Sequence, residues 1–168
     1  MVKIKVPYCK DSAMALWPTF KPSLEDKHGA NGRAGEKGEQ DCISLIEEHL
    51  PRYKICYDHT QDCVGQYFGI DLTCVSKDSI DTIDCKSGYT GLYWNREGQY
   101  WYITVKKDFF SPRKCNTHFM HVGLKGDVFV LYEKNILIDT WEDLHPIPCE
   151  YGVRIKLLDI KHFAETNL

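Results

Sequence analysis

The chain has 168 residues, of which 43% are hydrophobic and 27% are charged, so it is long enough for one domain with a sizeable core. Its formal net charge of −3 excludes binding to nucleic acid through overall positive charge, so any such contact must come from a local basic patch. No apolar run approaches the roughly 20 residues that span a bilayer, and the N-terminus lacks the apolar core of a signal peptide. We therefore expect no membrane partner and a cytoplasmic protein.

The N-terminal part is predicted to be mostly irregular. Residues 1–7 alternate apolar and basic side chains, which favours an edge strand. Residues 8–34 hold Pro18, Pro22 and a glycine-containing cluster that break any period, apart from a short helix over 11–16.

The first strong element is a helix over residues 36–50. Its apolar positions recur at helical spacing: Cys42, Ile43, Ile46 and Leu50. Pro51 ends the pattern, because proline cannot continue a helix. Glu39 falls on the apolar stripe, where a charge is unusual.

The rest of the chain is predicted to be mostly strands. In chain order the expected elements are strands over 53–57, 66–75 and 80–86, a hairpin of 91–94 with 99–105, a second hairpin of 118–122 with 128–132, a short strand over 136–138, a small helix over 141–144 and a strand over 153–160. One helix followed by mostly strands indicates an α+β fold with a mixed sheet. We expect a single domain, with an N-terminal extension (1–34), a motif-bearing core (35–90) and a β-rich remainder (91–168).

The eight cysteines include no C-x-x-C pair, and several lie in apolar segments. Without an export signal, reduced thiols are expected. The one suggestive cluster is Cys115 with His118 and His121, but on a strand the two histidines would point to opposite faces. A small zinc-stabilised β protein that uses Cys115, His118 and another cysteine is kept as an alternative.

Four charged residues form the most specific pattern: Glu39, Asp71, Asp84 and Lys86. Asp84 and Lys86 are two apart in an apolar, β-branched segment, so on a strand they share one face. Asp71 stands thirteen residues before Asp84, a spacing that fits a hairpin between the two. Acids that converge on an ammonium group are typical of the active site of a metal-dependent phosphodiesterase.

Hydrolysis of a phosphodiester needs a positioned water and neutralised charge on the phosphate oxygens. Mg²⁺, with Mn²⁺ as a substitute, suits this chemistry because it prefers carboxylate, carbonyl and water oxygens. We expect Asp71 and Asp84 to bind the ion together with the backbone carbonyl of Cys85. Glu39 would bind it through a water or hold a second ion, and Lys86 would orient the attacking water.

In these residues the chain resembles the PD-(D/E)xK nuclease superfamily, which includes restriction endonucleases and archaeal Holliday-junction resolvases. The core of that family is a helix with a Glu, then a β-meander with an Asp and a (D/E)-x-K pair. The matching residues are Glu39 on the helix, Asp71 in Gly-Ile-Asp, and Asp84-Cys85-Lys86. Residue 70 is Ile rather than Pro, the middle acid is Asp rather than the commoner Glu, and Glu36 rivals Glu39 on nearly the same helical face.

The resemblance covers residues 35–90 and implies a restriction-endonuclease-like core with added C-terminal β-hairpins. It implies a Mg²⁺-dependent endonuclease that acts on DNA, of the size of a phage, mobile-element or repair nuclease. Such a bare core usually needs a second subunit to cut both strands, so a homodimer is expected. The form of the nucleic acid, DNA or RNA and linear or branched, stays open.

Basic residues flank the aromatic pair Phe109-Phe110 and suit contact with backbone phosphates and stacked bases: Lys106, Lys107, Arg113 and Lys114, with Tyr89 nearby. A solvated loop over a core aromatic pair is the alternative for this segment. For the whole chain, the alternative is a catalytically inactive module on the same fold that binds nucleic acid or protein.

Overall fold

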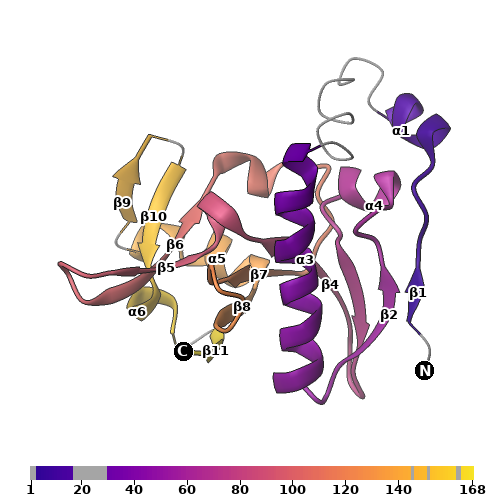
Figure 1. Ribbon diagram of the computed structural model, residues 1–168. Helices are drawn as coiled ribbons and strands as arrows, with labels where there is room; N and C mark the ends of the chain where they lie inside the picture. The colour runs from indigo at the N-terminus through magenta and orange to yellow at the C-terminus, as the bar shows by residue number, and fades with distance from the viewer. Residues whose placement is uncertain (1–2, 17–29, 145, 151, 162–163) are drawn as a thin grey trace.

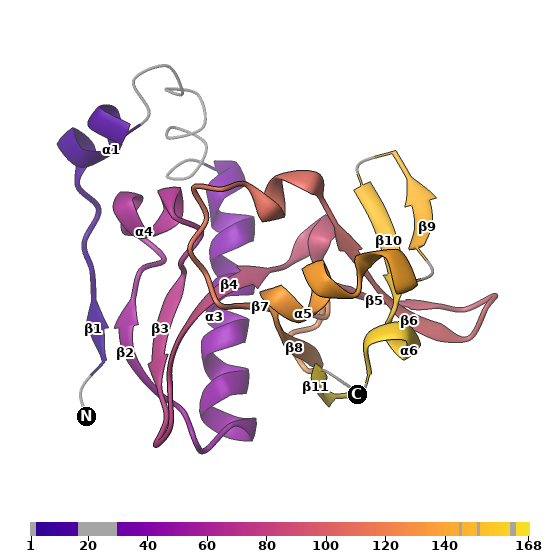
Figure 2. The same ribbon diagram turned by 180° about the vertical axis from the view of Figure 1, so that it is seen from behind.

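The computed structural model of the chain describes residues 3–16, 30–144, 146–150, 152–161 and 164–168. A long helix lies on one face of a seven-stranded sheet, and a four-stranded sheet stands beside it (Figure 1). The view from behind shows the large sheet in front of that helix (Figure 2). The predicted α+β class with a mixed sheet is confirmed.

The helices and 3-10 turns are α1 (Lys10–Leu16), α3 (Ala30–His49), α4 (Cys63–Tyr67), η1 (Gly88–Thr90), η2 (Lys107–Phe110), α5 (Lys134–Asp139), η3 (Trp141–Asp143) and α6 (Leu157–Ile160). The strands are β1 (Ile4–Lys5), β2 (Lys54–Asp58), β3 (Leu72–Val75), β4 (Ile80–Lys86), β5 (Leu92–Asn95), β6 (Tyr100–Val105), β7 (His118–Val122), β8 (Phe129–Glu133), β9 (Pro146–Cys149), β10 (Gly152–Lys156) and β11 (Ala164–Asn167). None of the helices within the described ranges combines the length and the apolar character needed to cross a bilayer.

The large sheet has the strand order β1-β2-β3-β4-β7-β8-β11. Strands β2, β3 and β4 form the predicted antiparallel meander, and β1 is an edge strand that pairs in parallel with β2. β4 pairs in parallel with β7, which forms an antiparallel hairpin with β8. The small sheet, β5-β6-β10-β9, is antiparallel throughout.

Helix α3 covers the large sheet because its apolar stripe is buried there. Cys42 and Ile46 are fully buried, and they share a core cluster with side chains of β2, β3, β4, β7 and β8. The helix begins at Ala30, earlier than the expected residue 36, and ends at His49 before Pro51. Residues 17–29 of the predicted irregular segment lie outside the described residues.

A second core cluster fills the opposite face of the large sheet. Phe119 of β7 and Val130 of β8 pack there with Ile103 of β6 and Ile155 of β10. The large sheet is therefore buried on both sides at β7 and β8, which explains why β8 lacks a clear alternation of apolar and polar residues.

The strand predicted over 66–75 is wrong in its first half. Residues 63–67 form the short helix α4, whose N-terminus is capped by Asp62: its side chain accepts a hydrogen bond from the Val64 amide. Gly69, with φ of +70°, then turns the chain, and β3 begins only at Leu72. Asp71 consequently lies at the entrance of the strand.

Two further elements near the C-terminus differ from expectation. The segment 136–138 lies in helix α5, where the Thr140 hydroxyl donates a hydrogen bond to the Ile136 carbonyl at 2.7 Å. The strand expected over 153–160 ends at Lys156 and gives way to α6, whose Leu157 and Ile160 are buried at helical spacing. Both predicted hairpins are confirmed, as are the short N-terminal helix and the strand over 80–86.

Candidate active site

Strand β4 places Asp84 and Lys86 on one face, as its two-residue period requires. Cys85, between them, packs on the α3 side in the first core cluster. Asp84 and Lys86 therefore point to the opposite side, toward Phe109 and Phe119. Lys86 Nζ lies 2.7 Å from Asp84 Oδ1, so the predicted pairing of carboxylate and ammonium is present.

Asp71 reaches the same end of β4 from the neighbouring strand. Its amide donates to the carbonyl of Ile83 at 2.9 Å, which ties the entrance of β3 to β4. Its Oδ2 accepts a hydrogen bond from the Cys85 amide at 2.7 Å, and its Oδ1 accepts one from the Gln66 side chain. The carboxylate is thus held in a fixed position beside Asp84, with only 5% of the residue exposed.

The surroundings of the Asp84 carboxyl group disfavour its charged form. Burial raises its pKa to about 6, the nearby Asp71 charge adds to the rise, and Lys86 opposes it. Its Oδ2 is buried and accepts no hydrogen bond within the described part of the chain. A buried carboxylate oxygen normally has a partner, so this atom has the capacity to accept a hydrogen bond or to bind a cation.

Lys86 stays charged despite its burial. Burial lowers its pKa, but the charge of Asp84 and the hydrogen bond to it outweigh that effect and raise the pKa overall. The ammonium group also lies 4.4 Å from the centre of the Phe109 ring and 5.9 Å from that of Phe119. The two rings fix the cation at the end of β4.

Glu39 approaches from the α3 side of the sheet. It stands on the buried stripe of α3, one turn before Ile43, as predicted. The hydrogen bond with Cys42 and burial raise the pKa of the Cys85 thiol, and the charge of Glu39 adds to the rise. Glu36, its rival, lies one turn earlier on the helix and is also half-buried. The structure thus places Glu39 next to β4, but behind the face that carries Asp84 and Lys86.

A close approach fixes α3 against the end of β4. Gly38 packs on Ser87, and a Cβ atom at Gly38 would lie 2.1 Å from Ser87 Oγ. Only glycine permits this contact, since no real Cβ comes so close to another heavy atom. Ser87 follows Lys86 directly, so the contact sets the distance between Glu39 and the candidate site.

The basic residues expected at the nucleic acid are distributed around η2. Lys107 is exposed, and Lys106 Nζ lies 6.0 Å from the centre of the Tyr89 ring, which is itself exposed. Arg113 donates to the carbonyl of Tyr67 at 2.5 Å, and Lys114 Nζ lies 5.5 Å from the centre of the Phe109 ring. Lys114 is therefore the one that reaches the Lys86 side of the site.

Three further residues, not predicted for the site, contribute to it. Gln66 holds Asp71 from a helix where a strand was expected. His121 stacks on Tyr132 at 5.5 Å between ring centres; its Nε2 accepts from the Tyr132 hydroxyl at 2.8 Å, and its Nδ1 donates to the Thr90 carbonyl at 2.5 Å. Burial lowers the pKa of His121 to about 3, and the charge of Lys86 adds to this, so the imidazole beside Lys86 is neutral.

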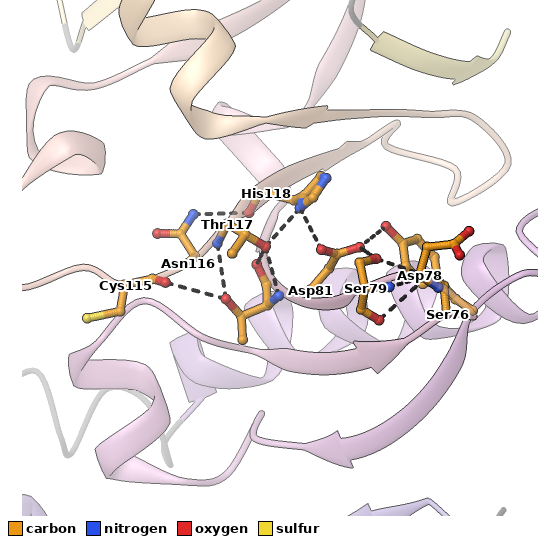
Figure 3. A network of polar contacts seen from close by, with 10 residues as sticks. Ser76, Asp78, Ser79, Asp81, Cys115, Asn116, Thr117 and His118 are labelled. Carbon is orange, nitrogen blue, oxygen red and sulfur yellow. Dashed lines mark hydrogen bonds and ion pairs between the residues drawn. The ribbon is translucent and has the colours of Figure 1, made fainter.

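The residues of the zinc alternative lie at the other end of β4. His118 Nδ1 lies 2.8 Å from Thr117 Oγ1 and 4.0 Å from Asp81 Oδ1, within a polar network that Figure 3 shows. In that view the Cys115 thiol points away from His118. Throughout the described ranges, no three His, Cys, Asp or Glu side chains are grouped closely enough to hold a metal ion.

The donor set at Asp84 nevertheless fits a hard cation. Asp84 Oδ2 is buried without a hydrogen bond, and Asp71 lies close enough to add to the rise in the pKa of Asp84. Mg²⁺ typically uses one or two carboxylates and keeps several waters, so it does not need a third protein carboxylate. Comparisons of the chain with protein-family models, with curated proteins and with solved structures give no match.

Proposed function

We propose that the chain is a Mg²⁺-dependent endonuclease of the PD-(D/E)xK type, which hydrolyses phosphodiester bonds of DNA. The observation that carries the proposal is the meeting of Asp71, Asp84 and Lys86 at one end of β4, with a buried carboxylate oxygen left open. The order of α3 followed by the meander β2-β3-β4 supports a restriction-endonuclease-like core.

Each residue has a definite part in this proposal. Asp84 Oδ2 and an oxygen of Asp71 would hold Mg²⁺; the Asp71 oxygens accept hydrogen bonds but keep further lone pairs. When bound, Mg²⁺ supplies charge neutralisation on the phosphate and a more acidic water. Lys86 donates a hydrogen bond to the attacking water and holds it in line with the phosphorus. Phe109 and Phe119 cover Lys86, which strengthens its electrostatic effect by excluding bulk water.

A second candidate, the non-catalytic binding module, is favoured by one observation. Lys86 pairs with one oxygen of Asp84 at 2.7 Å, and both oxygens of Asp71 accept hydrogen bonds from the protein. A site in that condition can serve stability alone, with nucleic acid bound to the basic residues around η2.

A cutting assay separates the two. Purified protein is incubated with supercoiled, linear and branched DNA in Mg²⁺ or Mn²⁺, and compared with Asp84→Asn and Lys86→Met. We expect both variants to lose at least about 100-fold in rate, as for loss of a group that acts on the transition state. Asp81→Asn is the matched control, since Asp81 lies on β4 but bonds Tyr53 and Ser79 at 2.6 and 2.8 Å, away from the site.

Cutting that persists in Asp84→Asn would overturn the nuclease proposal. DNA binding by the wild-type protein without any cutting, on all three substrates and with both metals, would favour the binding module instead.

A further inference from the structure

Lys114 is held in place more firmly than a surface lysine. Its amide donates to the carbonyl of Ser111 at 2.9 Å, and its carbonyl accepts from Lys134 Nζ at 3.0 Å. The next amide, that of Cys115, donates to the carbonyl of Phe68 at 2.7 Å. The backbone on both sides of Lys114 is therefore fixed to neighbouring segments.

The side chain is directed as well. Its stem lies across Gly69, where a Cβ atom would come within 3.1 Å of Lys114 Cγ. Gly69 also has a φ of +70°, a conformation that glycine adopts without strain. The fixed stem points the ammonium group of Lys114 toward the Phe109 ring.

Two ammonium groups consequently share one aromatic ring. Lys86 Nζ lies 4.4 Å and Lys114 Nζ 5.5 Å from the centre of Phe109. Burial and the charge of Lys86 lower the pKa of Lys114, and the charge of Lys114 opposes the rise in the pKa of Asp84. The two like charges repel each other, and the charges of Asp84 and Asp108 oppose this effect on the pKa of Lys114.

The ion pair between Lys86 and Asp84 does not explain why a second ammonium group, that of Lys114, lies beside the same ring. Lys86 already neutralises Asp84 at 2.7 Å, and among the described residues no carboxylate lies within ion-pair distance of Lys114 Nζ. An in-line displacement at phosphorus, by contrast, develops charge at two places, on the attacking oxygen and on the departing oxygen. Lys86 and Lys114, both beside the Phe109 ring, suit the attacking oxygen and the departing oxygen.

We propose that Lys114 is a second catalytic cation of this site, which donates a proton to the departing oxygen. This inference rests on the proposed nuclease function. In the step, the oxygen of the water forms a bond to phosphorus while the bond from phosphorus to the departing oxygen breaks. The water gives up one proton to solvent, the departing oxygen takes one from Lys114 Nζ, and Lys114 is protonated again from solvent.

The test compares two substrates that differ only in the departing atom. One is duplex DNA, and the other carries a bridging sulfur in place of the departing oxygen at a position that the wild-type protein cuts. A thiolate leaves without protonation. We therefore expect Lys114→Met to lose about 100-fold in kcat on the oxygen substrate and less than about 5-fold on the sulfur substrate. Lys114→Arg should recover part of the loss on the oxygen substrate.

Lys77→Met is the matched control, because Lys77 is exposed in the turn before β4, at the far end from the site. Its rates should equal those of the wild type, and thermal unfolding should show that all variants are folded. Equal losses of Lys114→Met on both substrates, or no loss on either, would overturn the role of Lys114 and leave the nuclease function standing. Full activity of Asp84→Asn, or no cutting by the wild type, would overturn the nuclease function and this inference with it.

Discussion

Lys86 Nζ lies 2.7 Å from Asp84 Oδ1, and the exposed fractions of the two side chains are only 15% and 6%. A buried ion pair of this kind adds little to stability, because the loss of hydration offsets the attraction between the charges. Ionisable groups that are kept buried in this way are concentrated at functional sites. The burial of this pair is therefore in keeping with the role proposed for Asp84 and Lys86.

The pH dependence of the free energy of unfolding should reveal the raised pKa of Asp84. Because its folded-state pKa, about 6, exceeds the ordinary 3.8, the folded protein binds more protons than the unfolded one between these values, and stability falls as pH rises through them. The free energy of unfolding of metal-free Asp84→Asn should gain about 2–3 kcal/mol over that of the wild type between pH 4 and pH 7. Urea unfolding across this range measures it, and parallel curves for the two proteins would contradict it.

His121 should show the opposite trend. Its folded-state pKa, about 3, lies below the ordinary 6.5, so stability is lost as pH falls from 6.5 toward 3, by up to about 4–5 kcal/mol. His121→Gln should remove this part of the acid sensitivity. Nitrogen NMR of the imidazole should show a neutral ring at pH 5 with the proton on Nδ1; an imidazolium signal at that pH would disprove the prediction.

Mg²⁺ should stabilise the folded protein through Asp84 and Asp71. At an ion concentration of ten times the Kd, the gain is about 1.4 kcal/mol, visible as a rise in Tm. Asp84→Asn and Asp71→Asn should weaken binding in calorimetry at least about 10-fold, whereas Asp81→Asn should bind like the wild type. If Asp84→Asn bound Mg²⁺ as tightly as the wild type, the ion would have to bind at another site.

The contact of Gly38 with Ser87 gives a test of how α3 is seated. Gly38→Ala should destabilise the protein by about 1–3 kcal/mol, because its Cβ would meet Ser87 Oγ at 2.1 Å and Ser87 Cβ at 2.2 Å. Ser87→Ala should not rescue this variant, whereas Ser87→Gly should, since the Ser87 Cα lies 3.7 Å away. Gly35→Ala is the control on the same helix: nothing lies within 4 Å, so we expect about 0.5–1 kcal/mol of stabilisation. Thermal unfolding of the four variants measures all of this.

The strands that carry the site could be predicted because their local pattern and their environment agree. The segment 80–86 is rich in β-branched residues, and its two-residue period placed Asp84 and Lys86 together, as the structure confirms. The same period misled at Phe68 and Ile70, where the alternation continues through a helix end and a turn. Asp62, a good N-cap residue, was the available signal for that helix.

The surroundings of the site could not be predicted, because they come from contacts between distant segments. Nothing in the sequence indicates that Gln66 bonds Asp71, or that Phe109 covers Lys86. The spacing of Leu157 and Ile160, by contrast, is a helical signal that the β-branched residues before it obscured.

The parallel pairing of β4 with β7 has a consequence for the order of folding. The chain leaves the large sheet after Lys86, forms η1, β5, β6 and η2, and returns at His118, which pairs with Ile83. The excursion, residues 87–117, is long, so bringing its ends together costs entropy before β4 and β7 form any stabilising contact. The β2-β3-β4 meander, by contrast, forms from neighbouring segments. Phe109 and Lys114 both lie on the excursion, so a refolding chain can hold its meander before it holds a complete site. Recovery of activity should therefore lag behind recovery of the circular-dichroism signal of the β-sheet. The length of this lag reports how long β4 and β7 take to pair.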